Sequence, residues 1–207
     1  MSYGVGTRVG VGVGVAAMAT LSSAQSGAAS VTYATWNPAD KGANITLSNG
    51  NLTAANAGSR ASVRATIPKT TGKWYWEITV GSLSTDYVVG IASASAAVAD
   101  GNYLGQDNFA YGWFAFGSGI FKNNVQVNAA AGYTTGNVLG FALDCGAGTL
   151  ALYNNNTLIT TLTGIALGTI YPACGGALSS TSSATANFGA TALTFTPPSG
   201  YNAGVYQ

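Results

Sequence analysis

The sequence has 207 residues, which is enough for one domain to bury a sizeable hydrophobic core without disulfides or metal ions. Only 6% of the residues are charged and the formal net charge is +1, so the composition argues against a chain that binds nucleic acid through a basic surface. The chain has two cysteines and no histidine, which excludes an ordinary Ser-His triad and the usual four-ligand zinc site within one chain. We therefore expect no enzyme activity, no cofactor and no metal.

The first thirty residues form an apolar, glycine-rich arm and a linker. Residues 9–21 follow a basic residue and precede small ones, as in a secretory signal, but we expect the segment to be retained. Its apolar run of about thirteen residues is shorter than the roughly twenty that a membrane helix needs, so no membrane contact is expected. Valines alternate with glycines at strand period, at Val9, Val11, Val13 and Val15.

Alone, this arm has too little apolar surface to bury, so we expect it to dock on a neighbouring subunit as an assembly arm. Residues 22–30 are rich in Ser, Ala and Gly and are predicted to be a flexible linker. The low charge of the whole chain also favours assembly, because neighbouring copies repel each other weakly. These features predict a homo-oligomer.

From Val31 to Gln207 short β-type runs alternate with turn residues at the spacing of a sandwich, and no stretch predicts a long amphipathic helix. The Asn49-Gly50 pair is a strong hairpin signal. The predicted fold class is all-β, an antiparallel two-sheet β-sandwich of jelly-roll type. We expect strands at 45–47, 51–53, 62–67, 74–80, 87–92, 110–116, 138–143, 149–153, 158–161, 170–175, 184–188 and 193–195. The stretches 93–109 and 117–133 are predicted to be long loops, where binding usually lies.

Several motifs along this region resemble, in order, those of the SPRY domain family. They are KWYWEI at 73–78, VGIA at 89–92, YGW at 111–113, GNVLG at 136–140 followed by LD at 143–144, GTLALY at 148–153, YPA at 171–173 and NFG at 187–189. The resemblance covers roughly Trp36 to Tyr201. Asn137 replaces the usual acid, and asparagines at 154–156 stand where Lys-Asn-Gly would close a turn. Asparagine tolerates the left-handed conformation of such a turn, so we expect the fold to be kept.

The resemblance implies a recognition sandwich without catalysis, whose loops at one end form a shallow pocket for a peptide or protein. A tyrosine in the connection 93–109 resembles a pocket residue of the family, which makes Tyr103 the best single contact. The remaining candidates for ligand binding are Asp107 in the same loop and the turn Gly175, Gly176 and Ala177. The domain type and the Ala- and Gly-rich composition are also similar to modules of bacteriophage structural proteins.

Other chemistry-bearing residues have simpler explanations. Asp100 and Asp107 are the carboxylates closest to a catalytic pair, but nothing flanking them predicts a raised pKa. Trp74, Trp76 and Trp113 are predicted to be core residues in preference to sugar-stacking platforms. The basic residues Arg60, Arg64, Lys69 and Lys73 are interpreted as solvated strand ends, and Cys145 and Cys174 as free thiols with one disulfide as the alternative.

Two functions remain open. The first is a non-enzymatic virion structural protein of a bacteriophage, anchored by its arm and displayed on the virion surface as decoration, fibre or adhesin. Its partners would be copies of itself or other virion proteins. The alternative is a free, secreted or extracellular SPRY-type binding module that recognises a host-surface protein or glycan through its loops.

Overall fold

The computed structural model describes residues 1–4, 6, 30–83, 87–116, 119–176 and 181–207. The four arm valines, Val9 to Val15, and the predicted contact Ala177 lie outside the described residues. The chain divides into two units, residues 1–30 and residues 31–207, and the fold below is that of the second. The described residues contain no helix long and apolar enough to cross a membrane.

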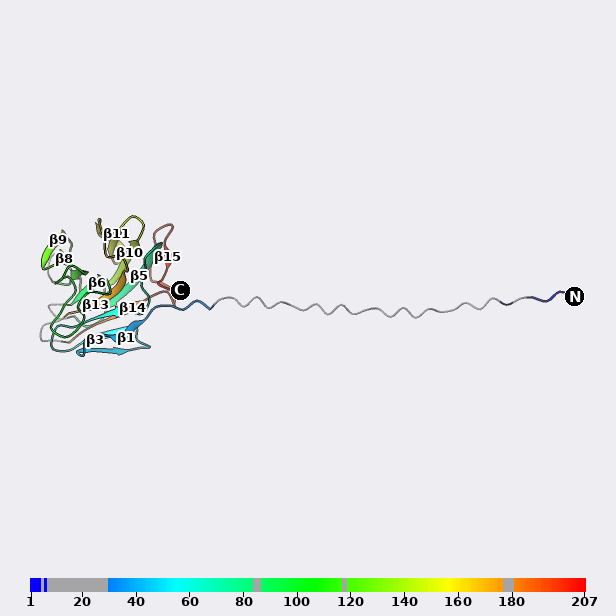
Figure 1. Cartoon of the computed structure of the whole chain (residues 1–207), viewed down its shortest axis with the longest axis horizontal. Helices are drawn as coiled ribbons and strands as arrows, with labels where there is room; N and C mark the ends of the chain where they lie inside the picture. Colours follow the sequence, from blue (N-terminus) through cyan, green and yellow to red (C-terminus); the bar gives the residue numbers. More distant parts are fainter. Residues whose placement is uncertain (5, 7–29, 84–86, 117–118, 177–180) are drawn as a thin grey trace. The chain divides into compact units, whose positions relative to one another are not determined.

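The second unit is built from β-strands joined by turns and loops (Figure 1). In chain order they are β1 (Trp36–Lys41), β2 (Ile45–Ser48), β3 (Thr53–Asn56), β4 (Ser62–Ala65), β5 (Lys73–Val80), β6 (Val88–Ala92), β7 (Ala110–Phe114), β8 (Gly119–Lys122), β9 (Val125–Ala129), β10 (Val138–Asp144), β11 (Thr149–Asn154), β12 (Thr157–Leu162), β13 (Tyr171–Gly175), β14 (Ser182–Asn187) and β15 (Asn202–Ala203).

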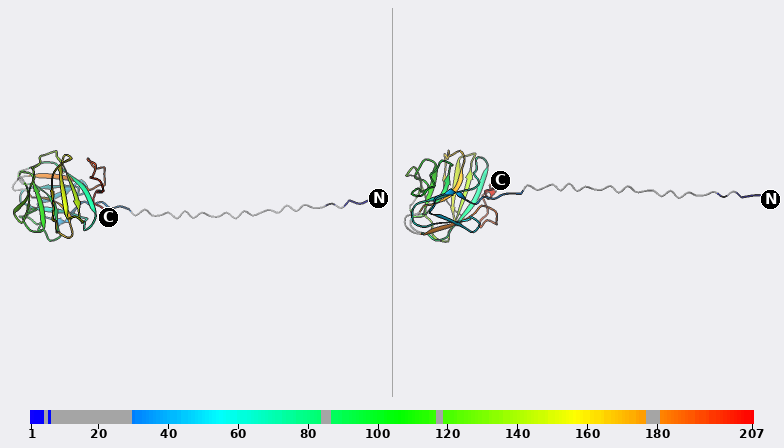
Figure 2. Two further views of the ribbon diagram at one scale, coloured as in Figure 1. Left: turned by 90° about the horizontal axis from the view of Figure 1, so that it is seen from above. Right: turned by 60° about the horizontal axis from the view of Figure 1, so that its bottom comes forward.

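The strands form two sheets that pack face to face, as the views in Figure 2 show. One sheet has the order β1-β4-β13-β6-β7-β8-β9, and the other has the order β12-β11-β10-β5-β14-β3-β2. All neighbours on these two paths are antiparallel, whereas β15 pairs with β5 in parallel. The predicted all-β, two-sheet sandwich is confirmed.

Aromatic side chains fill the space between the sheets. Trp76 and Phe141 stack with ring centroids 5.2 Å apart, and Trp113 meets the same phenylalanine edge-on at 6.4 Å. Trp76 and Trp113 are fully buried, so the prediction that they are core residues is confirmed. Trp74 is only half-buried, because it lies at the margin of the sheet under the Lys69 ammonium, whose Nζ is 3.5 Å from the ring centroid.

Two predicted segments differ from the structure. The expected loop 117–133 contains the hairpin of β8 and β9, which turns at Asn123 and Asn124, both with positive φ. The expected strand 193–195 is absent from the sheets, because the buried Glu77 carboxylate accepts the backbone N–H groups of Thr194 and Phe195 at 2.7 and 2.8 Å. A side chain therefore satisfies the backbone groups that a neighbouring strand would have bound.

The asparagine-rich turn between β11 and β12 keeps the fold as predicted. Asn155 and Asn156 have φ values of 46° and 65°, the left-handed conformation that a tight hairpin turn requires. Asn155 Oδ1 also accepts the backbone N–H of Val138 at 2.9 Å, which ties this turn to the start of β10.

The two cysteines lie in different sheets. Cys174 is fully buried in β13, and Cys145 follows the last residue of β10 at the edge of the core. Both are free thiols, as expected from the sequence. Burial raises the pKa of the Cys174 thiol to about 12, so the group is a neutral core side chain at ordinary pH.

Candidate functional site

The loop 93–109, between β6 and β7, covers the outer face of the seven-stranded sheet. Leu104 and Ala96 of the loop are buried in a small apolar cluster with side chains of β6, β7 and β13. The fit is close at Gly112, where an added Cβ would lie 2.2 Å from the Leu104 carbonyl oxygen. The loop is therefore packed on the sheet, and its outward side chains are carried by a fixed backbone.

Arg64 of β4 fastens this loop to the sheet. Its guanidinium forms a bidentate ion pair with Asp40 of β1, with both N–O distances 2.7 Å. The same group donates to the carbonyl oxygens of Ser93 and Ala96 in the loop at 2.9 and 2.7 Å. Only 8% of the Arg64 side chain is exposed, so these charge-assisted bonds lie largely out of water. The arginine is a structural anchor, and the interpretation as a solvated strand end is wrong for it and for Lys69, which is also buried.

Asp107 fixes the other end of the loop. Its carboxylate accepts the backbone N–H groups of Ala97 at 3.1 Å and Phe109 at 2.8 Å, and its carbonyl oxygen accepts the N–H of Asn123 at 2.9 Å. The predicted role of Asp107 as a partner contact stays a prediction, because its carboxylate already holds the loop together. Asp100 likewise accepts the Asn44 backbone N–H at 3.0 Å, so both carboxylates already accept hydrogen bonds from the backbone.

Tyr103 lies half-buried on this loop and is held on three sides. The Arg60 guanidinium carbon lies 4.5 Å from the centroid of its ring, and the Phe114 ring meets it edge-on at 5.6 Å. The phenol hydroxyl donates to Asn124 Oδ1 in the β8–β9 turn. The ring and the cation above it are therefore pre-positioned, and a partner would lose little rotamer entropy in binding them.

The second part of the predicted site, Gly175 and Gly176, meets the loop at the segment that precedes β4. Gly176 donates to the Ala61 carbonyl oxygen at 2.5 Å, and Gly101 of the loop donates to the Arg60 carbonyl oxygen at 2.6 Å. A Cβ on Gly175, whose φ is 144°, would lie 2.2 Å from the Ala61 carbonyl oxygen. The structure thus brings both parts of the predicted site to residues 60–61, although both glycines are buried.

Arg60 differs from the other charged residues in the groups that its side chain contacts. Among the charged residues that the structure describes, the other ten each form a hydrogen bond or an ion pair with a protein group: Asp40, Lys41, Arg64, Lys69, Lys73, Glu77, Asp100, Asp107, Lys122 and Asp144. The Arg60 side chain lies on the face of Tyr103, and among the described residues its guanidinium has no acidic partner. Sequence reasoning placed Arg60 with ordinary solvated strand ends and missed it.

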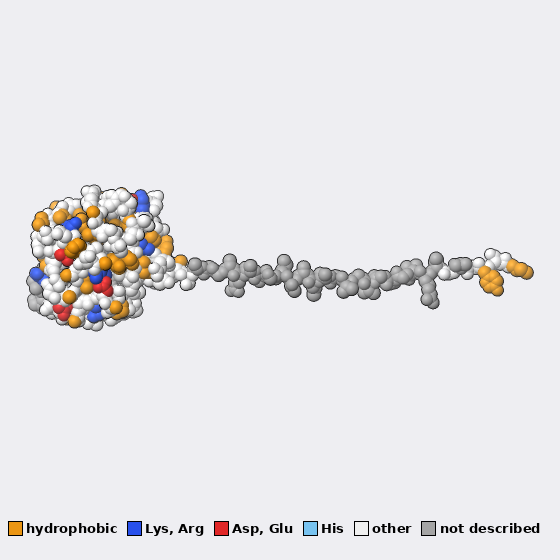
Figure 3. All heavy atoms as spheres, in the orientation of Figure 1, with side chains coloured by type: hydrophobic (Ala, Val, Ile, Leu, Met, Phe, Trp, Pro, Cys, Tyr) orange, Lys and Arg blue, Asp and Glu red, His pale blue; other side chains and the backbone are white. Residues whose placement is uncertain are grey.

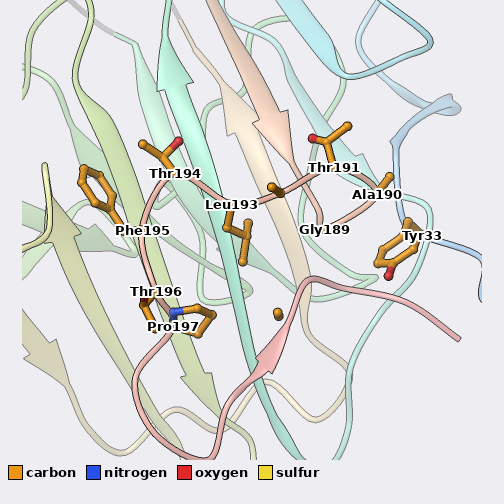
Figure 4. A pocket seen from close by; sticks show the side chains of 11 residues that line it. Tyr33, Gly189, Ala190, Thr191, Leu193, Thr194, Phe195, Thr196 and Pro197 are labelled. Atoms are coloured by element: carbon orange, nitrogen blue, oxygen red, sulfur yellow. The ribbon is translucent and has the colours of Figure 1, made fainter.

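Two shallow hollows elsewhere on the domain differ from this loop surface in the side chains that line them. One of about 520 Å³ lies between the C-terminal segment 189–197, Tyr33 and Ala203, and apolar, aromatic and threonine side chains line it (Figure 4). Another, of about 350 Å³, lies beside Phe109. Neither is lined by a charged side chain or by Tyr103. Among the described residues no three His, Cys, Asp or Glu side chains come together as a metal site would require.

On the face of the domain that Figure 3 shows, a few charged side chains lie among neutral and hydrophobic ones. An antiparallel sandwich that presents a packed loop, with an aromatic ring and a cation stacked on it, is the architecture of a β-sandwich recognition domain. The family model for the SPRY domain matches residues 73–191, and the chain belongs to this family. SPRY domains are typically protein-binding modules.

Three solved structures share the fold. The crystal structure of the SPRY domain of human HERC1 is 16% identical with a TM-score of 0.65, and the match covers 73% of this chain and 96% of that one. The TRIM65 PSpry domain is 14% identical with a TM-score of 0.62, over 75% of this chain and 90% of that one. The stonustoxin structure is 20% identical with a TM-score of 0.62, over 75% of this chain but only 27% of stonustoxin.

Proposed function

We propose that this chain is a non-enzymatic binding module whose partner is a protein that contacts Arg60 and Tyr103 on the loop 93–109. The observation that carries the proposal is the Arg60 guanidinium, stacked on Tyr103 and free of any acid among the described residues. A guanidinium presents donors in a planar fork that matches a carboxylate, and a tyrosine beneath it adds apolar area. Arginine and tyrosine are also the residue types over-represented among interface hot spots.

The partner should therefore present an acidic side chain next to an apolar or aromatic one. A carboxylate would bind the Arg60 fork, and the neighbouring apolar group would cover the exposed part of the Tyr103 ring. Gly175 and Gly176 would contribute by bringing the β13 backbone close to the same segment, and not through side chains. A glycan, the other ligand considered, would lack the carboxylate unless it were an acidic sugar.

The test is affinity capture from extracts of the cells that the protein encounters, with the unaltered chain as the bait. We expect a protein that the unaltered chain retains to be lost with Arg60→Met and with Tyr103→Ala. Each substitution should weaken binding by about 2 kcal/mol, the scale of an interface hot spot. Because the Tyr103 ring is half-buried, Tyr103→Ala should also lower the free energy of unfolding by about 1 kcal/mol, so binding is measured on protein shown to be folded.

A second cation–π pair provides the matched control. The Lys73 ammonium lies 5.6 Å from the centroid of the half-buried Tyr201 ring, at the start of β5 in the other sheet. Lys73→Met and Tyr201→Ala remove the same kinds of group away from the loop, and capture should survive both. Loss of capture with all four variants would sink the proposal, and so would retention with all four.

For the biological setting we propose display on a virion, with the arm as the anchor and the sandwich as decoration, fibre or adhesin. The features that favour it are the 6% charge content and the valine-glycine alternation of residues 9–15, neither of which a freely diffusing module needs. The partner would then be a host-surface protein. A secreted or extracellular module is the alternative setting, with the same binding surface.

The arm is tested by deleting residues 1–30. The strands begin at Trp36, so we expect a folded sandwich with unchanged circular dichroism that no longer incorporates into its assembly. Purified particles would be analysed for both forms by immunoblotting. Incorporation of the truncated chain at the normal level would refute anchoring by the arm while leaving the binding surface untouched.

A further inference from the structure

One side of the sandwich is formed by strands that end the two sheets within the described part of the chain. β9 ends the seven-stranded sheet and β12 ends the other, and the two edges lie together. Asn128 Nδ2 of β9 donates to Thr160 Oγ1 of β12 at 2.9 Å, which joins them. We call this surface the β9–β12 side.

Apolar side chains are exposed along this side. Val125 and Val127 of β9 are 59% and 46% exposed, and Leu158 of β12 is 54% exposed. Beside them lies a hollow of about 430 Å³ lined only by residues 129–131, all alanine, and by Leu158 and Ile159. Exposed apolar side chains next to an apolar hollow, on one surface, are typical of a contact site between proteins.

The opposite side of the sandwich is protected in the way expected of an edge. There β1 carries Pro38, Asp40 and Lys41, and Lys41 Nζ donates to the Ile45 carbonyl oxygen of β2 at 2.7 Å. Proline and charged residues on an edge strand prevent association with another sheet. The sequences of β9 and β12, VQVNA and TLITTL, contain neither proline nor a charged residue.

We propose that the β9–β12 side is a two-fold contact between two copies of this chain. In such a contact the same patch faces itself, so any net charge on the patch would repel its own copy. A patch without charged side chains avoids this repulsion, and exposed valines beside an alanine-lined hollow let each copy offer both a projection and a recess. A charged partner would find nothing on β9 or β12 to pair with.

The contact is made by side chains, because both edges are irregular. The register of β9 shifts opposite Ile120 and Phe121, and that of β12 shifts opposite Leu152 and Tyr153. Such bulges interrupt the row of backbone groups that a continuous sheet between copies would need. β9 and β12 provide eleven residues, five and six respectively, against about twenty to thirty on each side of a standard interface. The dimer should accordingly be weak, with a Kd on the order of micromolar to tens of micromolar.

Sedimentation velocity of the full chain, from about 1 to about 300 µM, tests the proposal around that Kd. The weight-average mass should rise from 20.7 kDa toward twice that value. Val127→Lys and Leu158→Lys should each raise the Kd at least about tenfold, because each buries an unpaired charge at the contact. Val31→Lys is the matched control: Val31 is 52% exposed and lies next to Thr32, which pairs with the C-terminal residue Gln207, so this change should leave the Kd unaltered.

A mixture of two oppositely charged variants tests whether the partner is a second copy of this chain. Val127→Lys and Val127→Glu should each be monomeric alone, and their equimolar mixture should associate at least about tenfold more tightly than either. A monomeric unaltered chain throughout the range, Lys variants that associate normally, or a mixture no tighter than its components would each refute the two-fold contact. Arg60→Met should dimerise normally and Val127→Lys should still capture the binding partner, so this contact and the binding surface succeed or fail separately.

Discussion

Arg64 offers the sharpest test of how the binding loop is held. Its guanidinium joins three elements at once: β4, which carries it, β1 through Asp40, and the loop 93–109 through the carbonyl oxygens of Ser93 and Ala96. Arg64→Met keeps most of the apolar stem and removes every one of these bonds. The substitution therefore separates the packing of the side chain from its polar contacts.

The loss in the free energy of unfolding is estimated from the Asp40 carboxylate, which Arg64→Met leaves without its partner. Removing one partner of a buried ion pair costs about 3–5 kcal/mol, most of it because the remaining charge is unpaired. The Asp40 side chain is 27% exposed, so water can reach it, and we take the lower end, about 3 kcal/mol. For a domain of this size that corresponds to a fall in Tm of about 6–12 °C. The Ser93 and Ala96 carbonyl oxygens also lose their donor, which should loosen the loop.

Urea unfolding followed by tryptophan fluorescence gives the free energy, and hydrogen exchange read by mass spectrometry gives the opening of residues 93–109. Arg64→Lys should lose an intermediate amount, because an ammonium keeps the charge but lacks the planar fork that serves a carboxylate and two carbonyls together. Arg60→Met is the matched control. It removes the same group four positions earlier, where only a cation–π contact is lost, and should cost no more than about 1 kcal/mol.

Two results would refute this reasoning. The first is an equal loss of stability in Arg60→Met and Arg64→Met, which would mean that the hydrogen bonds of Arg64 contribute nothing beyond the stem. The second is a destabilised Arg64→Met whose loop exchanges no faster than in the unaltered chain, which would mean that the arginine serves β1 and not the loop.

Two further predictions concern the buried thiol and phenols. Cys145 and Cys174 should both react with a thiol reagent in unreduced, denatured protein, and Cys174 should not react before unfolding; a count of zero would establish a disulfide. Burial raises the pKa of Cys174 from 9.0 to about 12 and the pKa values of Tyr87 and Tyr133 well above their usual value. As the pH rises, these groups lose their protons in the unfolded chain before they lose them in the folded one. The free energy of unfolding should therefore be unaffected by them below pH 9 and should fall at higher pH, by up to about 1.4 kcal/mol per pH unit for the thiol. Unfolding curves recorded as a function of pH measure this fall.

The central strands could be predicted because their signals are local. β5 and β11 begin or end within one residue of the predicted ranges, since aromatic and branched side chains alternate along them and asparagine or glycine closes the turns. β1 and β9 were missed for the opposite reason. β1 contains a proline and two charged residues, and β9 is exposed along most of its length, so neither shows a buried face in its sequence.

The segment 193–195 was predicted to be a strand because its composition favours an extended backbone. Whether an extended segment joins a sheet depends on which acceptor its N–H groups meet, and here that acceptor is Glu77, a residue more than a hundred positions away. A buried glutamate of this kind is visible in the sequence only as part of a Trp-Glu motif. Its role as an acceptor for the chain's C-terminal segment requires the three-dimensional arrangement.

Arg60 and Arg64 show most directly why the binding surface could not be predicted in full. They are four residues apart, are flanked by similar small residues, and were interpreted alike as solvated strand ends. Arg64 belongs to β4, whose register sets it beside Asp40 and under the loop, whereas Arg60 precedes the strand and lies on the ring of Tyr103. Whether a cation is available to a partner is thus decided by long-range neighbours. In a chain with 6% charged residues, a cation that has no acidic partner among the described residues can discriminate strongly between binding partners. Moving the guanidinium by Arg60→Ala together with Ala99→Arg, at an exposed alanine of the same loop whose φ is not positive, should restore charge without the stacked geometry and should not restore capture.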